Sequence, residues 1–230
     1  MVRSLLSRLP RAQRDVVFFQ ETDRRVVALT IDDSPDPETT SDILSVLRSH
    51  KAPATFFITG DHAKEGSDIL DCIAKDRHDL GNHLMRDYAA IRLSRDEFER
   101  DFLACEDILR PFGLPRFFRP PSAIYRRSML DFAAKWGYRS VLGDAFPIDT
   151  HISHQPLRRA ILRWLIKPGS IIVLHDRGAR GRRTTETLLW LLPWLDGEGL
   201  EPVSLDRLLD EERAAPHDVK GQTPSDSWSA

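Results

Sequence analysis

The stretch VVALTIDDSPD, from Val26 to Asp36, carries the clearest structural signal in the chain. An apolar run ends on two adjacent carboxylates, Asp32 and Asp33, and a proline turn follows at once. A short apolar run bounded by turn residues is typical of a strand buried on both faces of a parallel sheet. Adjacent like charges add no stability to a strand end, so the pair indicates a functional site.

Short apolar runs alternate with amphipathic stretches along most of the chain, which indicates repeated strand–helix units. A capping box at Ser94 and Glu97 marks the start of one of the helices. The pattern predicts an α/β fold, a distorted (β/α) barrel of about seven parallel strands with outer helices, and an open doubly wound sheet is the alternative. The predicted strands lie at 26–31, 54–59, 79–83, 116–119, 138–143, 170–175 and 201–205, and the later helices at 156–166 and 184–195.

The chain divides into three parts by its pattern. Residues 1–25 form an N-terminal lead-in, residues 26–212 a catalytic domain, and residues 213–230 a C-terminal tail. The tail lacks periodicity and is rich in turn-forming residues, which predicts disorder.

Composition excludes several classes of function. With 230 residues, 41% of them hydrophobic, the chain suits one domain with a sizeable core. Its net charge of −2 shows no excess of positive charge of the kind that binds nucleic acid. Cys72 and Cys105 are predicted to pack in the core, because two cysteines in apolar helical patterns offer neither a disulfide framework nor a cysteine-based zinc site. No secretory signal and no apolar segment of membrane-spanning length is found, so we expect a cytoplasmic protein.

Polar side chains follow five of the predicted strands. The carboxyl ends of parallel strands meet at one edge of a barrel, where enzymes of this architecture carry their chemistry. Several separate strand ends with acidic, histidine or arginine side chains therefore predict a shared active site. These residues are Asp32 and Asp33, His83, Arg119, Asp144, and His175 with Asp176.

The segment NHLMRD has a spacing that a metal site could use, although for this pair alone we favour a solvent-facing Asp87 and a His83 that caps a helix. His83 and Asp87 are four residues apart, and on a helical turn this spacing would put both side chains on one face. Asp33 could supply a third, oxygen ligand. One histidine with two carboxylates suits zinc, and suits harder divalent ions better than three histidines do.

Four segments resemble the motifs of the polysaccharide deacetylase family, carbohydrate esterase family 4. TIDDSPD resembles its first motif, T-F-D-D-G-P, and GNHLMRD resembles its second, H-[ST]-x-x-H. FRPPSAIY is similar to the third, R-x-P-x-G-x-x-Y, and IIVLHD to the fifth, a leucine–histidine pair at a strand end. The resemblance covers residues 26–209.

The resemblance implies a role for each matching residue. Asp32 would be the general base, with Arg119 paired to it, and His175 the general acid. The backbone N–H of Ser122 would stabilise the oxyanion, and Leu174 would line the acetyl pocket. The metal ligands would be Asp33, His83 and Asp87, and the metal a divalent ion, with zinc preferred over cobalt, nickel or manganese.

Three positions depart from the family pattern. Asp87 stands where the family has its second metal-binding histidine, and Ser122-Ala123 replaces the usual aromatic–glycine pair. The fourth motif, D-x-x-D-W, reads GDAFPIDTH and has no tryptophan. Either Asp144 or Asp149 would orient His175, and we favour Asp149.

The leading hypothesis is a metal-dependent hydrolase that removes N-acetyl groups from a glycan. A hydrolase of non-carbohydrate amide bonds is the first alternative, because the motifs of the acetyl pocket are the altered ones. A glycan-binding module without turnover is the second, although binding alone requires no acid–base pair. The expected partner is a carbohydrate substrate.

Overall fold

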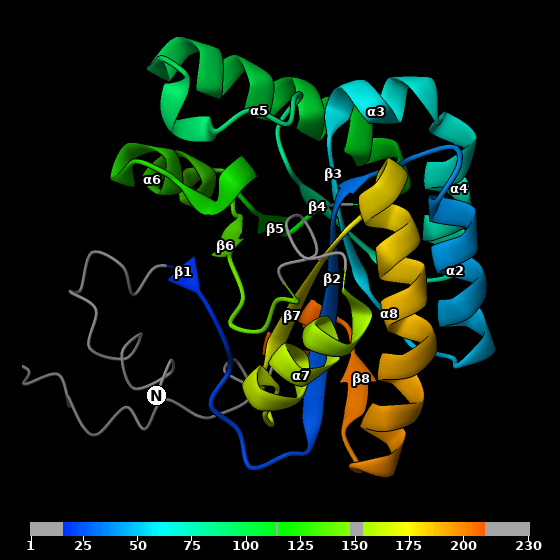
Figure 1. The fold of residues 1–230 in the computed structure, drawn as a ribbon. Coiled ribbons are helices and arrows are strands. Elements are labelled where there is room, and N and C mark those ends of the chain that lie inside the picture. The colour runs from blue at the N-terminus through cyan, green and yellow to red at the C-terminus, as the bar shows by residue number, and fades with distance from the viewer. Residues whose placement is uncertain (1–15, 114, 148–153, 210–230) are drawn as a thin grey trace, which may run out of the picture.

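The computed structural model describes residues 16–113, 115–147 and 154–209 of the chain. Its strands form one sheet in the order β1-β6-β5-β4-β3-β2-β7, and β8 pairs with β2 as well; every ladder between these strands is parallel. Helices cover the sheet from outside, and α2 and α8 lie side by side against β2 and β7 (Figure 1). The strands are β1 (Val16–Val17), β2 (Val26–Ser34), β3 (Thr55–Ile58), β4 (Asp79–Asn82), β5 (Phe117–Phe118), β6 (Arg139–Val141), β7 (Ile171–His175) and β8 (Glu201–Val203).

Eight α-helices are described in these residue ranges. They are α2 (Thr40–Ser49), α3 (Gly60–Glu65), α4 (Ser67–Lys75), α5 (Arg95–Leu109), α6 (Arg127–Lys135), α7 (Gln155–Leu165), α8 (Gly178–Gly197) and α9 (Leu205–Leu209). The predicted capping box is confirmed at the start of α5, where Ser94 and Glu97 exchange hydrogen bonds. No helix in the described part of the chain is long and apolar enough to span a membrane.

The barrel closes between β6 and β7. Ala145, just after β6, forms a parallel bridge with Ile172, and its carbonyl accepts a hydrogen bond of 2.8 Å from Val173 N. The Asp144 carboxylate accepts a further hydrogen bond from Ile171 N, at 3.0 Å. These contacts join β7, at one end of the sheet, to the segment that follows β6 near the other end. The predicted distorted (β/α) barrel is therefore confirmed.

The structure adds details that the pattern did not predict. All seven predicted strands are present, but β1 lies in the predicted lead-in and pairs with β6. Helix α3 was not predicted, and α8 begins six residues earlier than expected. Cys105 is buried as predicted, whereas Cys72 is exposed, because it lies on the solvent side of α4. The predicted disordered tail, 213–230, lies outside the described residues.

Alternating side chains on β2 separate two apolar regions. Val27, Leu29 and Ile31 belong to a large cluster that packs against the helices. Val26 and Ala28 point the opposite way, into a second cluster inside the barrel with Phe57 and others. The polar residues considered next lie on this interior side, at the carboxyl ends of the strands.

Candidate active site

A bulge in β2 explains how two adjacent aspartates reach one site. Side chains alternate along a strand, so Asp32 and Asp33 would normally point to opposite faces. Ile31 pairs with Phe56 and Ser34 with Ile58, which leaves one extra residue in β2 between these pairs. Asp33 also has a φ of 67°, in the left-handed region. A bulge of this kind redirects a side chain, and here it turns Asp33 towards the end of β4.

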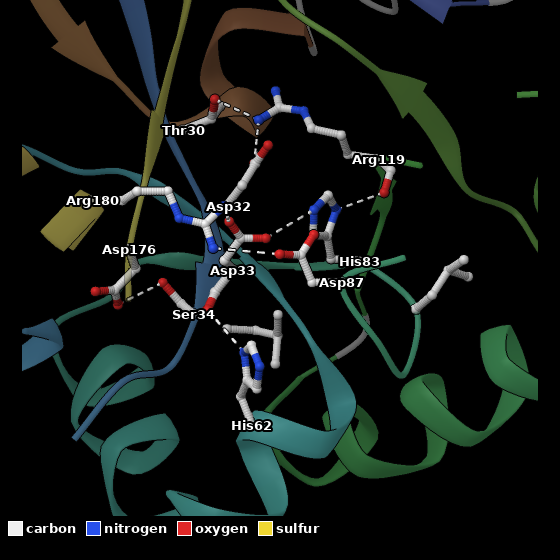
Figure 2. A network of polar contacts seen from close by, with 12 residues as sticks. Thr30, Asp32, Asp33, Ser34, His62, His83, Asp87, Arg119, Asp176 and Arg180 are labelled. Carbon is white, nitrogen blue, oxygen red and sulfur yellow. Dashed lines mark hydrogen bonds and ion pairs between the residues drawn. The ribbon is translucent and has the colours of Figure 1, made fainter. Parts of the chain in front are cut away.

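Asp32 is buried in an ion pair with Arg119, as the sequence predicted. Arg119 Nη1 donates to Asp32 Oδ1 at 2.5 Å and to Thr30 Oγ1 at 2.9 Å, and Arg119 Nε donates to the Val141 carbonyl (Figure 2). The guanidinium carbon lies 4.1 Å from the centre of the Phe57 ring. Burial lowers the pKa of Arg119, and the charge of Asp32 opposes that shift. Each of these two buried charges thus has an oppositely charged partner inside the barrel.

Asp33 faces His83 across the end of the barrel. His83 Nδ1 lies 2.7 Å from the Arg119 carbonyl and donates to it, which leaves Nε2 directed at Asp33 Oδ1, 3.5 Å away. Burial alone would raise the pKa of Asp33, but the hydrogen bond and charge of His83, with the charge of Arg180, lower it to about 2. The other carboxylate oxygen, Asp33 Oδ2, is buried without a hydrogen bond.

The segment from His83 to Asp87 is not helical. The structure has bends there, and Leu84 adopts a φ of 63°, because Asn82 Oδ1 accepts a hydrogen bond from Leu84 N and turns the chain. The predicted helical turn is therefore wrong. Asp87 nevertheless reaches the site, where its Oδ2 accepts a hydrogen bond of 3.4 Å from Arg180 Nη2.

Arg180 was missed by the sequence reasoning. It lies in the first turn of α8, and its Nη1 is 3.0 Å from Asp33 Oδ2. The guanidinium thus contacts two of the three predicted metal ligands, Asp33 and Asp87 (Figure 2). The surrounding sequence, RGARGRR, contains four arginines and gives no signal that singles out this one.

His175 ends β7 directly beside Asp32. The two residues are register partners in the parallel pairing of β2 with β7, so their side chains lie on the same face. Of the two candidates for orienting His175, Asp144 accepts hydrogen bonds from Ser170 Oγ and Ile171 N. Asp149 lies outside the described residues, and its role stays a prediction.

Leu174 is better assigned to the core than to the site. It is fully buried in the cluster that faces the helices, on the side of β7 opposite His175. The neighbour that shares the His175 face is Val173, which makes it the better candidate for a pocket wall. The implied role of Leu174 in lining an acetyl pocket stays a prediction.

Ser122 and Ala123 keep an unusual backbone conformation. Their φ angles are 63° and 56°, in the left-handed region that favours glycine. Ala123 occupies the place of the glycine in the family pattern, and its backbone has the positive φ that glycine adopts most readily. Ser122 itself is exposed, and its predicted hydrogen bond to an oxyanion stays a prediction.

A buried carboxylate fixes the loops behind the site. Asp176 accepts hydrogen bonds from Ser34 Oγ at 3.0 Å, and from the hydroxyls of Thr39 and Thr40. Burial raises the pKa of Asp176, and these hydrogen bonds oppose the shift. The network ties the end of β2, the start of α2 and the start of α8 together.

The donor chemistry of the site fits a divalent cation. Asp33 Oδ2 is buried without a hydrogen bond, and the Nδ1 contact of His83 presents Nε2 as a ligand, as metal-binding histidines usually do. Asp87 is drawn towards the same position by Arg180. Within the described ranges, however, no three histidine, cysteine or acidic side chains stand close enough to hold a metal in the present arrangement.

Comparison with known proteins agrees with this geometry. The family model described as polysaccharide deacetylase matches residues 19–141. A peptidoglycan-N-acetylglucosamine deacetylase of Bacillus cereus is 30% identical over 198 residues, which cover 84% of this chain and 92% of the relative. A chitooligosaccharide deacetylase of Bradyrhizobium is 30% identical over 200 residues, covering 80% and 90%. The chain therefore belongs to the polysaccharide deacetylase family.

Solved structures give the same result for the fold. A peptidoglycan N-acetylglucosamine deacetylase superposes with a TM-score of 0.82 at 26% identity, covering 87% of this chain and 96% of that one. A mutant of a carbohydrate esterase family 4 pseudoenzyme, described as having restored enzymatic activity, superposes with a TM-score of 0.78 at 26% identity, covering 85% and 71%.

Proposed function

We propose that this protein is a metal-dependent hydrolase that removes N-acetyl groups from glycans containing N-acetylglucosamine. The observation that carries the proposal is the division of the two aspartates. Asp32 is paired with Arg119 beside His175, and Asp33 is turned towards His83. In this proposal one carboxylate acts as the base and its neighbour as a metal ligand. The names of the relatives support the choice of substrate class.

The residues of the chain can divide the work of amide hydrolysis. A divalent cation held by Asp33, His83 and Asp87 would polarise the amide carbonyl and lower the pKa of a nearby water towards ~7. Asp32 would accept the proton of the attacking water. His175, next to Asp32 on the neighbouring strand, would donate a proton to the departing amine. Each positioned acid or base of this kind typically raises the reaction rate by roughly 10²- to 10⁴-fold.

A family member without turnover is the second candidate. Arg180 favours it, because its guanidinium contacts two of the three predicted ligands. The retention of Asp32, Arg119 and His175 favours the enzyme, because a binding module has no use for a buried base and its paired arginine. A hydrolase of other amides remains the third candidate, since the fourth motif lacks its tryptophan.

Acetate release distinguishes these candidates. We expect zinc- or cobalt-loaded wild-type protein to release acetate from chitin oligomers, and Asp32→Asn to lose the activity by at least a hundredfold while still binding the oligomer. Asparagine keeps the shape of the aspartate side chain, so the loss of activity can be assigned to the missing carboxylate. Oligomer binding without acetate release by the wild type would establish the non-catalytic candidate. Turnover of small amides but not of glycans would establish the third.

A further inference from the structure

Arg180 is the group that the proposed function leaves without a role. Its Nη1 is 3.0 Å from Asp33 Oδ2, and its Nη2 is 3.4 Å from Asp87 Oδ2 (Figure 2). The Asp33 side chain is only 2% exposed, whereas that of Arg180 is 29% exposed. The arginine therefore reaches a buried carboxylate from the rim of the site.

The charges explain why a cation lies there. Asp32, Asp33 and Asp87 bring three carboxylates into a small volume, and Arg119 pairs only with Asp32. A buried carboxylate without a counter-charge is strongly unfavourable. His83 and Arg180 contact Asp33 and offset its charge, and the charge of His175 makes a smaller contribution. Arg180 also forms an ion pair with Asp87.

The geometry shows that the contact with Asp33 is incomplete. Asp33 Oδ2 is close to Arg180 but lacks a correctly directed hydrogen bond, so its lone pairs remain unused. A metal ligand needs those lone pairs. A divalent cation bound to Asp33 and Asp87 would stand where the guanidinium now contacts both, and two cations a few ångströms apart repel each other.

The backbone of α8 is anchored at Arg180, whereas the Arg180 side chain is partly exposed. Gly181 packs against Thr39 so closely that a Cβ there would lie 2.2 Å from Thr39 Oγ1. Thr184 Oγ1 donates to the His175 carbonyl at 2.6 Å, which ties the same helix to β7. The backbone at position 180 is therefore fixed, but its long and partly exposed side chain has room to turn into solvent.

We propose that Arg180 is an intramolecular counter-cation that holds Asp33 and Asp87 in the metal-free protein and leaves when a divalent metal binds. The proposal rests on the metal site of the proposed function. It adds that Arg180 and the metal compete for Asp33 and Asp87. Metal must displace a tethered positive charge, so the arginine weakens the affinity of the site for metal. It also protects the metal-free fold from repulsion between the carboxylates.

Calorimetric titration of chelator-stripped protein with zinc ions tests this directly. We expect Arg180→Gln to bind zinc about ten- to a hundredfold more tightly than the wild type, because the competing charge is gone. Arg182→Gln is the matched control: it removes the same charge two residues along α8, where Arg182 forms an ion pair of 3.7 Å with the exposed Glu38. This control should bind zinc within about threefold of the wild type.

Thermal unfolding provides a second measurement that is independent of activity. Metal-free Arg180→Gln should unfold at a lower temperature than wild type, and saturating zinc should remove the difference. If the wild type binds zinc and Arg180→Gln binds it equally or more weakly, the competition is refuted while the metal-dependent function stands. If neither protein binds zinc, the metal-dependent function fails and the competition fails with it.

Discussion

At the scale of single residues, neighbouring side chains of the same type have different environments. Asp32 points into the barrel and pairs with Arg119, and Asp33 is turned by the bulge towards His83. The resemblance to the family's motifs implied that Asp32 pairs with Arg119 and that Asp33 lies near His83. It could not predict the bulge, since this depends on how β2 pairs with β3, nor the contacts of Arg180, since its long side chain can reach several carboxylates.

His175 provides a test of the proposed proton transfer. Replacing it with alanine should lower the rate of acetate release by about two to four orders of magnitude, because one acid–base group is lost. The content of bound metal should not change, since the proposed ligands are Asp33, His83 and Asp87. Metal analysis of the purified variant beside wild type checks this. A variant that loses its metal would make His175 a ligand.

His78 is a buried histidine outside the site. Its lowered pKa lets us predict how the stability of the protein depends on pH. Its Nδ1 accepts a hydrogen bond from Ala54 N, and burial lowers its pKa to about 4 from 6.5. Between these values the unfolded chain binds more protons than the folded one, so protons favour unfolding. The contribution of His78 to stability is thus complete above pH 6.5 and is lost as the pH falls towards 4.

The variant His78→Asn should remove this dependence, because asparagine offers an acceptor near Nδ1 and does not titrate. Urea unfolding at pH 7 and pH 5 measures the effect. We expect the wild type to lose about 1–2 kcal/mol more than the variant between the two pH values. An equal loss in both proteins would show that His78 is not a buried neutral group.

At the scale of elements, the strands were more predictable than the loops that bear the site. An apolar run such as VVALTI has few alternatives to a buried strand, and the capping box of α5 rests on local hydrogen bonds. The turn after His83 rests on a local side-chain hydrogen bond, from Leu84 N to Asn82 Oδ1, that an apolar pattern does not reveal. The early start of α8 involves residues distant in sequence, because Gly181 packs against Thr39 and Gly178 N donates to Asp36 Oδ2. Patterns along the chain do not contain that information.

Helix α8 is expected to tolerate no side chain at its contact with α2. A Cβ at Gly181 would lie 2.2 Å from Thr39 Oγ1 and 2.8 Å from Asp176 Oδ1. Gly181→Ala should therefore destabilise the protein by about 1–3 kcal/mol, the usual cost of overpacking. Gly197→Ala in the same helix is the control: nothing lies within 4 Å of its Cβ position, so it should be neutral or stabilising by up to about 1 kcal/mol. Chemical denaturation compares the two, and equal effects would contradict the close packing.

At the scale of the whole molecule, the parallel barrel is what assembles the site. Asp32, His83, Arg119 and His175 are far apart in sequence, and each lies at or just after the carboxyl end of a different strand. That placement follows from the fold and was predictable as soon as the strands were recognised. The fold alone does not determine activity, and the family contains a structural relative described as a pseudoenzyme.

In the proposed function, hydrolysis depends on a metal held by this chain. The most direct test is to titrate chelator-stripped protein with zinc or cobalt ions and to measure acetate release from a chitin oligomer at each addition. We expect no activity without metal, and a linear rise that levels off at about one metal ion per chain. Full activity in the stripped protein, or a filled metal site without any acetate release, would contradict it.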